Sequence, residues 1–200
     1  MQSKDLSGIH IEGHIKIYDP ITQEIYINKR NAIHYENMSV ALAESIANTS
    51  QGFIYQMDFG NGGTAIDPTG IITYLTPNST GSNASLYNKT YSKVVDGQAV
   101  TNTDPTRNYL ETRHVTGTNY TDVFVTCMLD YGEPTGQQAF DNTTNNNSEF
   151  VFDELGLRSY SSAGNSLLLT HVIFHPVQKS LNRLIQIDYT VRIQSLTGVA

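Results

Sequence analysis

The C-terminal part of the chain carries the pattern that most restricts its fold. Apolar and polar side chains alternate along residues 184–193, with Ile185, Ile187 and Tyr189 on the apolar face. A two-residue period is typical of a β-strand with one buried and one solvated face. Residues 167–174 are apolar on both faces, which indicates a central strand covered on both sides. The sequence therefore predicts a fold built on long strands.

One segment has the spacing of a helix. Met38, Leu42 and Ile46 lie four residues apart, which places them on one face of an α-helix. Other apolar or alternating segments are bounded by turn residues. They predict strands at 9–18, 24–28, 53–59, 71–75, 109–115, 122–129 and 149–157. We expect a mainly β fold class, an antiparallel β-sandwich or jelly-roll-like single domain over residues 1–200, with one α-helix at about 36–47 and long polar loops.

Residues 76–108 form a long polar excursion that is rich in Asn, Ser, Thr and Gly. A loop of this length inside a compact domain is usually functional or held by a partner. Tyr87, Tyr91 and Tyr109 lie in or beside it, and tyrosine offers a large contact area at low entropy cost. We name these tyrosines as candidate protein–protein contact residues; the alternative is that they hold the loop to its own domain. Residues 141–148 are predicted to be a solvated loop tip.

Charge and composition exclude several classes of function. The net charge of −7 argues against specific nucleic-acid binding through phosphate neutralisation. Cys127 is the only cysteine, so an internal disulfide is impossible, and its apolar neighbours predict a buried thiol. No segment approaches the roughly 20 apolar residues of a membrane span. The N-terminus lacks the apolar segment of a signal peptide, so we expect no membrane partner and synthesis in a cytoplasm.

Two pairs of histidines have a four-residue spacing, His10 with His14 and His171 with His175. On a helix such a pair could bind one metal ion. Both pairs fall in predicted strands, where four residues span about 13 Å, so the two rings cannot share an ion. The dipeptide at His175 and Pro176 is expected to end its strand.

Other patterns that carry chemistry are weak. Residues 60–63, Gly-Asn-Gly-Gly, lack the Lys-Ser/Thr and the following helix of a phosphate-binding loop, so we expect a strand-terminating turn. Pairs of carboxylates could form an acid–base couple across strands. The candidate pairs are Asp153 with Glu154 and Glu149 with Asp188. A calcium site at Asp67, Asp96 and Asp104 lacks the oxygen-ligand spacing of a known loop. We therefore assign no catalytic, cofactor-binding or metal-binding residue and expect a non-enzymatic protein.

Three segments carry a resemblance to a known family. They are Ile-Asn-Lys-Arg-Asn-Ala-Ile-His at 27–34, Asp-Phe-Gly-Asn-Gly-Gly at 58–63 and Thr-His-Val-Ile-Phe-His-Pro-Val-Gln at 170–178. The chain resembles virion structural proteins of large contractile-tailed, T4-like bacteriophages over most of its length. The resemblance implies a place in the phage particle, with other copies of the chain and other virion proteins as partners. It implies no site residue.

The resemblance and the composition together predict an assembly role. Rigid sheets with long polar loops suit a subunit of a symmetric shell or ring. The leading hypothesis is a ring component of the neck or tail at the head–tail junction, where an acidic surface tolerates passing DNA. Alternatives in the same class are a capsid decoration (cement) protein on the head surface and a baseplate component. A carbohydrate-binding β-sandwich module is the alternative of another class, although the chain has no Trp for stacking on sugars.

Overall fold

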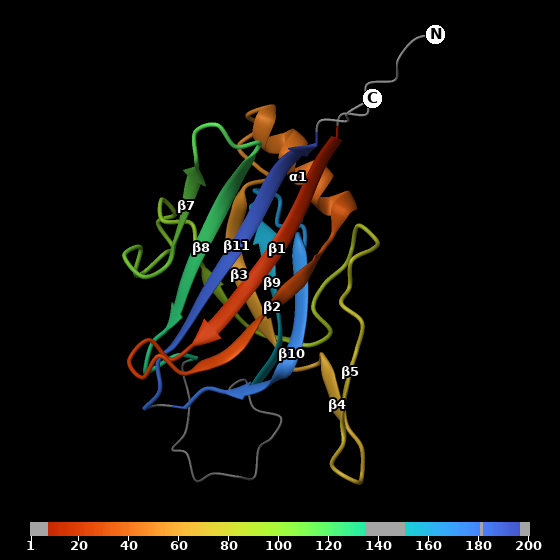
Figure 1. The fold of residues 1–200 in the computed structure, drawn as a ribbon, viewed down its shortest axis with the longest axis vertical. Helices are drawn as coiled ribbons and strands as arrows, with labels where there is room; N and C mark the ends of the chain where they lie inside the picture. Colours follow the sequence, from red (N-terminus) through yellow and green to blue (C-terminus); the bar gives the residue numbers. More distant parts are fainter. Residues whose placement is uncertain (1–7, 135–150, 181, 197–200) are drawn as a thin grey trace.

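The structure is a computed structural model that describes residues 8–134, 151–180 and 182–196. Within these ranges, nine strands form one antiparallel sheet in the order β6-β3-β9-β10-β2-β1-β11-β8-β7 (Figure 1). These strands are β1 (Gly8–Tyr18), β2 (Ile25–Ile33), β3 (Ile54–Gly60), β6 (Lys89–Val94), β7 (Tyr109–His114), β8 (Tyr120–Leu129), β9 (Val151–Ser159), β10 (Thr170–Gln178) and β11 (Ile185–Leu196). A separate hairpin contains β4 (Thr64–Ile66) and β5 (Ile72–Tyr74), and α1 spans Tyr35–Ile46.

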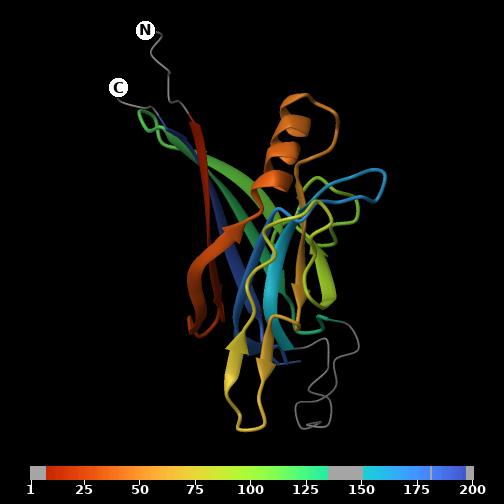
Figure 2. The ribbon, with the colours of Figure 1, turned by 90° about the vertical axis from the view of Figure 1, so that its right-hand side faces the viewer.

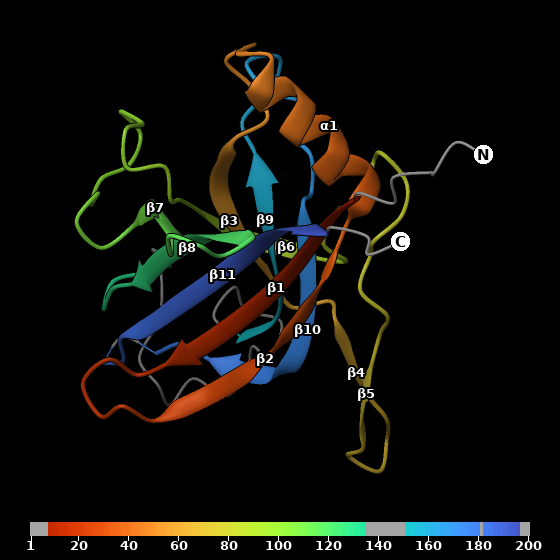
Figure 3. The same cartoon turned by 45° about the horizontal axis from the view of Figure 1, so that its top comes forward.

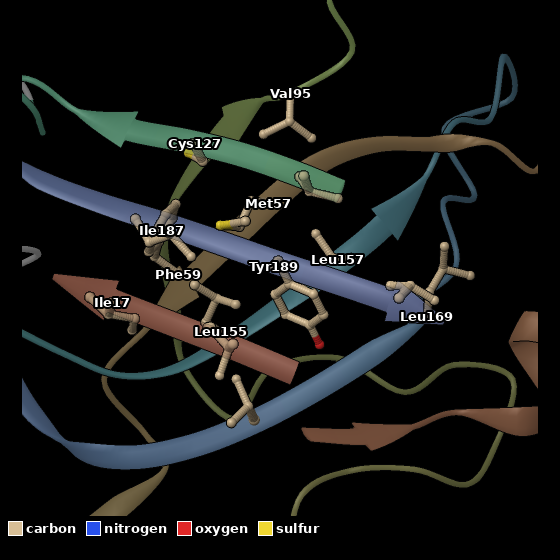
Figure 4. Packing of buried hydrophobic residues seen from close by; sticks show 14 of the residues in the cluster. Ile17, Met57, Phe59, Val95, Cys127, Leu155, Leu157, Leu169, Ile187 and Tyr189 are labelled. Carbon is tan, nitrogen blue, oxygen red and sulfur yellow. The ribbon is translucent and has the colours of Figure 1, made fainter. Parts of the chain in front are cut away.

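The sheet curls so that its two halves face each other like the layers of a sandwich (Figure 2). Side chains from β1, β8 and β11 meet those from β3, β9 and β10 in one apolar core (Figure 4). Met57, Leu155, Leu157 and Ile187 have no exposed surface. Burying each such side chain contributes roughly 1.5–3 kcal/mol relative to leaving it in water. The predicted mainly β, sandwich-like fold with one helix is confirmed.

The alternating pattern at the C-terminus forms the centre of one layer. β11 pairs with β1 and β8, and Tyr189 lies opposite Ile15 in the register with β1. Both side chains are fully buried, while Asp188 and Thr190 on the other face are partly exposed. The two-residue period therefore separates the core from the solvent as predicted.

The helix lies over one end of the sheet, between β2 and β3 in the chain (Figure 3). His34 caps its N-terminus, because Nδ1 of the ring accepts a hydrogen bond from the Asn37 backbone N–H (3.2 Å). Met38 is buried, as predicted. Ile46, from the same predicted stripe, is 84% exposed because it belongs to the last turn.

Three expectations about the strands need correction. The excursion at 76–108 is not one loop, because β6 runs through its middle. The β10 strand does not end at His175 and Pro176 but continues to Gln178; an irregularity between Ile173 and Val177 accommodates the proline. The apolar segment at 71–75 pairs with β4, a strand that the sequence pattern did not predict.

The predicted loop tip at 141–148 lies outside the described residues. In the described part of the chain, no helix is long and apolar enough to cross a membrane.

Candidate assembly surface

The β4–β5 hairpin projects from the end of the sandwich (Figures 1 and 2). We call residues 64–75 the arm. Residues 67–71 connect its two strands, and in this connection Gly70 has a φ of 86° that favours glycine. Asp67 closes the turn by accepting hydrogen bonds from Thr69 and from the Ile71 N–H (2.9 Å). The hydrogen bonds from Thr69 and Ile71 lower the pKa of Asp67, so the turn keeps its charged acceptor near neutral pH.

A buried carboxylate anchors the arm to the sheet. Asp153 on β9 is 3% exposed, and it accepts hydrogen bonds from the N–H groups of Gly63 and Thr64, both at 2.9 Å, and from the Thr64 hydroxyl. The backbone N–H of Leu75 donates to the carbonyl of Gly63 (2.9 Å), which joins the two strands at their base. The arm therefore leaves the domain in a defined direction.

The arm exposes large apolar side chains. Ile66, Ile71 and Tyr74 are 66%, 61% and 53% exposed, and Leu75 next to them is also exposed. An isolated two-stranded hairpin is only marginally stable in water, and grouped exposed apolar side chains mark interaction sites. An anchored hairpin with this surface is suited to packing against another protein.

The segment after the arm is bound to the domain interior by a second carboxylate. We call residues 76–88 the strap. Glu154 on β9 is fully buried and accepts hydrogen bonds from the N–H groups of Tyr87 (2.9 Å), Asn88 (2.7 Å) and Gly62 (3.1 Å), and from His171 Nε2 (3.0 Å). Burial opposes the charge, but the hydrogen bonds from His171 and the three amides outweigh it and lower the pKa of Glu154.

Two buried histidines hold the strap along its length. Nδ1 of His171 accepts the Asn78 N–H (2.7 Å), so its proton resides on Nε2, which donates to Glu154. His34 uses Nδ1 for the helix cap, so its Nε2–H donates to the Gly81 carbonyl (2.9 Å). Both rings are fully buried. They serve as fixed hydrogen-bonding groups in this arrangement.

The three candidate tyrosines come from different elements. Tyr87 in the strap packs its ring against the ring of His171, and the two ring centroids are 5.8 Å apart. Its hydroxyl donates a hydrogen bond to the Thr76 carbonyl, and the residue remains 45% exposed. Tyr91 on β6 packs against Phe59 in the core, and burial raises the pKa of its hydroxyl. Tyr109 on β7 is half-buried. Among the described residues, no ring contact joins any two of these tyrosines.

The other candidate residues are now placed. Cys127 is fully buried, as predicted, and burial raises the pKa of its thiol to about 12. The turn at 60–63 ends β3, and the N–H groups of its last two glycines bind Glu154 and Asp153. In the described ranges, no group of three or more His, Cys, Asp or Glu side chains is arranged to hold a metal ion. Glu149 lies outside the described residues, so its pairing with Asp188 stays untested.

The sequence pattern did not predict the arm. A signal was present, because Asp67, Pro68 and Gly70 are turn residues between apolar segments that could have formed a hairpin. Asp153 and Glu154 were considered as an acid–base couple, whereas the structure uses both as acceptors for backbone N–H groups.

Comparison with known proteins adds no relative. No protein-family model matches the chain, and neither a curated protein nor a solved structure matches it.

Proposed function

We propose that the chain is a non-enzymatic virion structural protein of a contractile-tailed bacteriophage, acting as a ring component at the head–tail junction of the neck or tail. The observation that carries the assembly role is the arm, which is held at its base by Asp153 and exposes Ile66, Ile71 and Tyr74. The resemblance to T4-like virion proteins supports the place in the particle. The expected partners are other copies of the chain and other virion proteins.

The distribution of charge supports an assembly contact through the arm. Residues 64–75 contain a single charged residue, Asp67, in a chain of net charge −7. The carboxylate of Asp67 is bound within its own turn, so the arm presents an almost neutral apolar surface. The net negative charge of the chain disfavours adhesion to DNA that passes through a ring.

The first test is gold-labelled antibody localisation on purified virions. Label at the head–tail junction or along the tail supports a ring component, and label over the head supports the decoration protein. Label at the distal end of the tail supports the baseplate component. Disrupted particles provide the control for a buried epitope; label on neither intact nor disrupted particles contradicts a virion role.

The contribution of the arm is tested by incorporation into particles. Ile66→Asp places a charge on the arm, and Ile21→Asp makes the same change in the β1–β2 turn at nearly equal exposure, 67% against 66%. We expect both variants to fold, and only Ile66→Asp to be lost from particles. Equal incorporation of the two variants contradicts an assembly role for the arm. Binding to a glycan array, with normal particles formed by both variants, would instead support the carbohydrate-binding module.

A further inference from the structure

The outer strand of the arm presents an open backbone edge. The Asp67 N–H donates to the Ile71 carbonyl (3.0 Å), which makes these residues a hydrogen-bonded pair. Hydrogen-bonded and non-hydrogen-bonded pairs alternate along an antiparallel ladder. The N–H and C=O groups of Ile72 and Tyr74 therefore point away from β4. β4 is the strand of the arm that packs on β10, and β5 forms its outer strand, with the Tyr74 hydroxyl 3.3 Å from His175 Nδ1 on β10 (Figure 1).

The sheet itself offers a second open edge at β7, the last strand in the sheet order. Among the described residues, the backbone of residues 110–114 forms hydrogen bonds only with β8. The opposite edge of the sheet is β6, and its Lys93 side chain donates to the carbonyl of Met128 on β8 (2.6 Å). An open edge such as β7 is a template for pairing with a further strand.

Charge favours a contact between these two edges. Copies of a chain with a net charge of −7 repel one another over most of their surfaces. The arm is nearly neutral, and the charged residues of β7, Glu111 and Arg113, form an ion pair. Two copies can therefore bring these edges together without adding like charges to the contact.

The geometry points to a head-to-tail contact in which β5 of one copy adds as an extra strand to β7 of a neighbouring copy. The arm and β7 lie on opposite sides of the molecule (Figures 1 and 3), and a contact between two such different surfaces is heterologous and can close into a ring. The backbone hydrogen bonds give the affinity, and the exposed Ile71 and Tyr74 supply apolar contact beside them. This inference rests on the proposed function, because a homomeric ring needs such a contact between copies.

Engineered cysteines in the full chain test the contact directly. Thr73→Cys lies on β5 and Thr112→Cys on β7, and both positions are exposed. The native Cys127 is fully buried and does not compete for oxidation. When the two variants are mixed with oxidised glutathione, we expect a disulfide-linked heterodimer as the main cross-linked product, detected by non-reducing electrophoresis and peptide mass spectrometry. The matched control, Thr73→Cys mixed with Ser45→Cys on the exposed end of α1, should give no heterodimer.

Two results overturn the inference. Homodimers of Thr73→Cys as the main product would mean that arms pair with each other, and the absence of any cross-link would mean that the contact does not form. Particles assembled from a chain with both substitutions separate this inference from the proposed function. If the doubly substituted chain enters particles but forms no disulfide-linked multimers there, the strand addition is refuted and the virion role is not. If the heterodimer forms in solution but the chain is absent from particles, the virion role is refuted and the strand addition is not.

Discussion

The strap at residues 76–88 and the second loop at residues 95–108 have similar polar sequences but are held in different ways. Side chains from other parts of the fold hold the strap, and the most important of them, Glu154 and His171, are fully buried. The second loop is held mostly by its own residues, such as Asp96, which accepts the Gln98 N–H (2.9 Å). The comparison teaches that composition does not reveal which polar loop depends on the interior of the protein.

A buried side chain connects the second loop to the sheet, in addition to the backbone hydrogen bonds that Val95 and Asp96 donate to the Tyr55 carbonyl on β3. Asn108 is fully buried; its Oδ1 accepts the backbone N–H of Met128 (2.9 Å), and its Nδ2 donates to the Asp104 carbonyl (3.0 Å). Asn108 therefore continues the pairing of β8 beyond the start of β7. The buried side chain that holds the strap, Glu154, is charged, whereas the buried side chain that holds the second loop, Asn108, is a neutral amide. The two loops should consequently respond differently to substitution and to pH.

The largest effect is expected from Glu154→Gln. The amide NH₂ group would face N–H groups of the strap or of His171, so buried donors would lose their acceptor. We expect the free energy of unfolding to fall by about 3 kcal/mol, measured by urea denaturation. The control is Glu12→Gln, which removes an ion pair with Arg30, a side chain that is 82% exposed. This control should change the free energy of unfolding by less than about 0.5 kcal/mol. An equal loss in both variants would show that the buried carboxylate holds the strap no more strongly than an exposed ion pair holds the surface.

Acidification should weaken the attachment of the strap. The pKa of Glu154 is lowered in the folded state, so its contribution to stability is complete above the unfolded-state pKa of about 4.3. This contribution is lost as the pH falls through the lower folded pKa. Urea denaturation at pH 7 and pH 3 should show a smaller loss of stability for Glu154→Gln than for the wild type. Identical pH profiles of the two proteins would contradict the anchoring role of the carboxylate.

Asn108→Ala should lower the free energy of unfolding by about 2 kcal/mol, because the buried N–H of Met128 loses its acceptor. The loss should be the same at pH 7 and pH 3, since the amide does not titrate. Hydrogen exchange at Met128 should accelerate while exchange at Tyr87 in the strap is unchanged. Faster exchange at both positions would mean that the two loops open together.

The smallest effect is expected from Asp104→Asn in the second loop. Asp104 accepts a hydrogen bond from the Thr106 hydroxyl (2.7 Å) and pairs with Arg107 (3.5 Å), but these groups are largely solvated. The free energy of unfolding should change by less than about 0.5 kcal/mol. A loss comparable to that of Glu154→Gln would show that the second loop also depends on a charged anchor.

The strands with clear periodicity were predictable, and β6 was not. Only Tyr91 and Val94 are apolar among the six residues of β6, and neither Lys89 nor Lys93 indicates a strand. An edge strand has few neighbours to pack against, so its sequence carries a weak pattern. For the candidate surface, the sequence indicated the tyrosines near the excursion, whereas the exposed apolar side chains lie on the arm. The sequence could not show this, because the exposure of a side chain depends on which segments fold over it.

The sequence by itself determined the fold class, because the alternation around Tyr189 and the spacing around Met38 encode which face of each element is apolar. Only the tertiary structure decided that Asp153 and Glu154 would anchor the arm and the strap. Their hydrogen-bond donors come from segments distant in sequence, and a carboxylate is stable in the interior only where folding brings such donors to it.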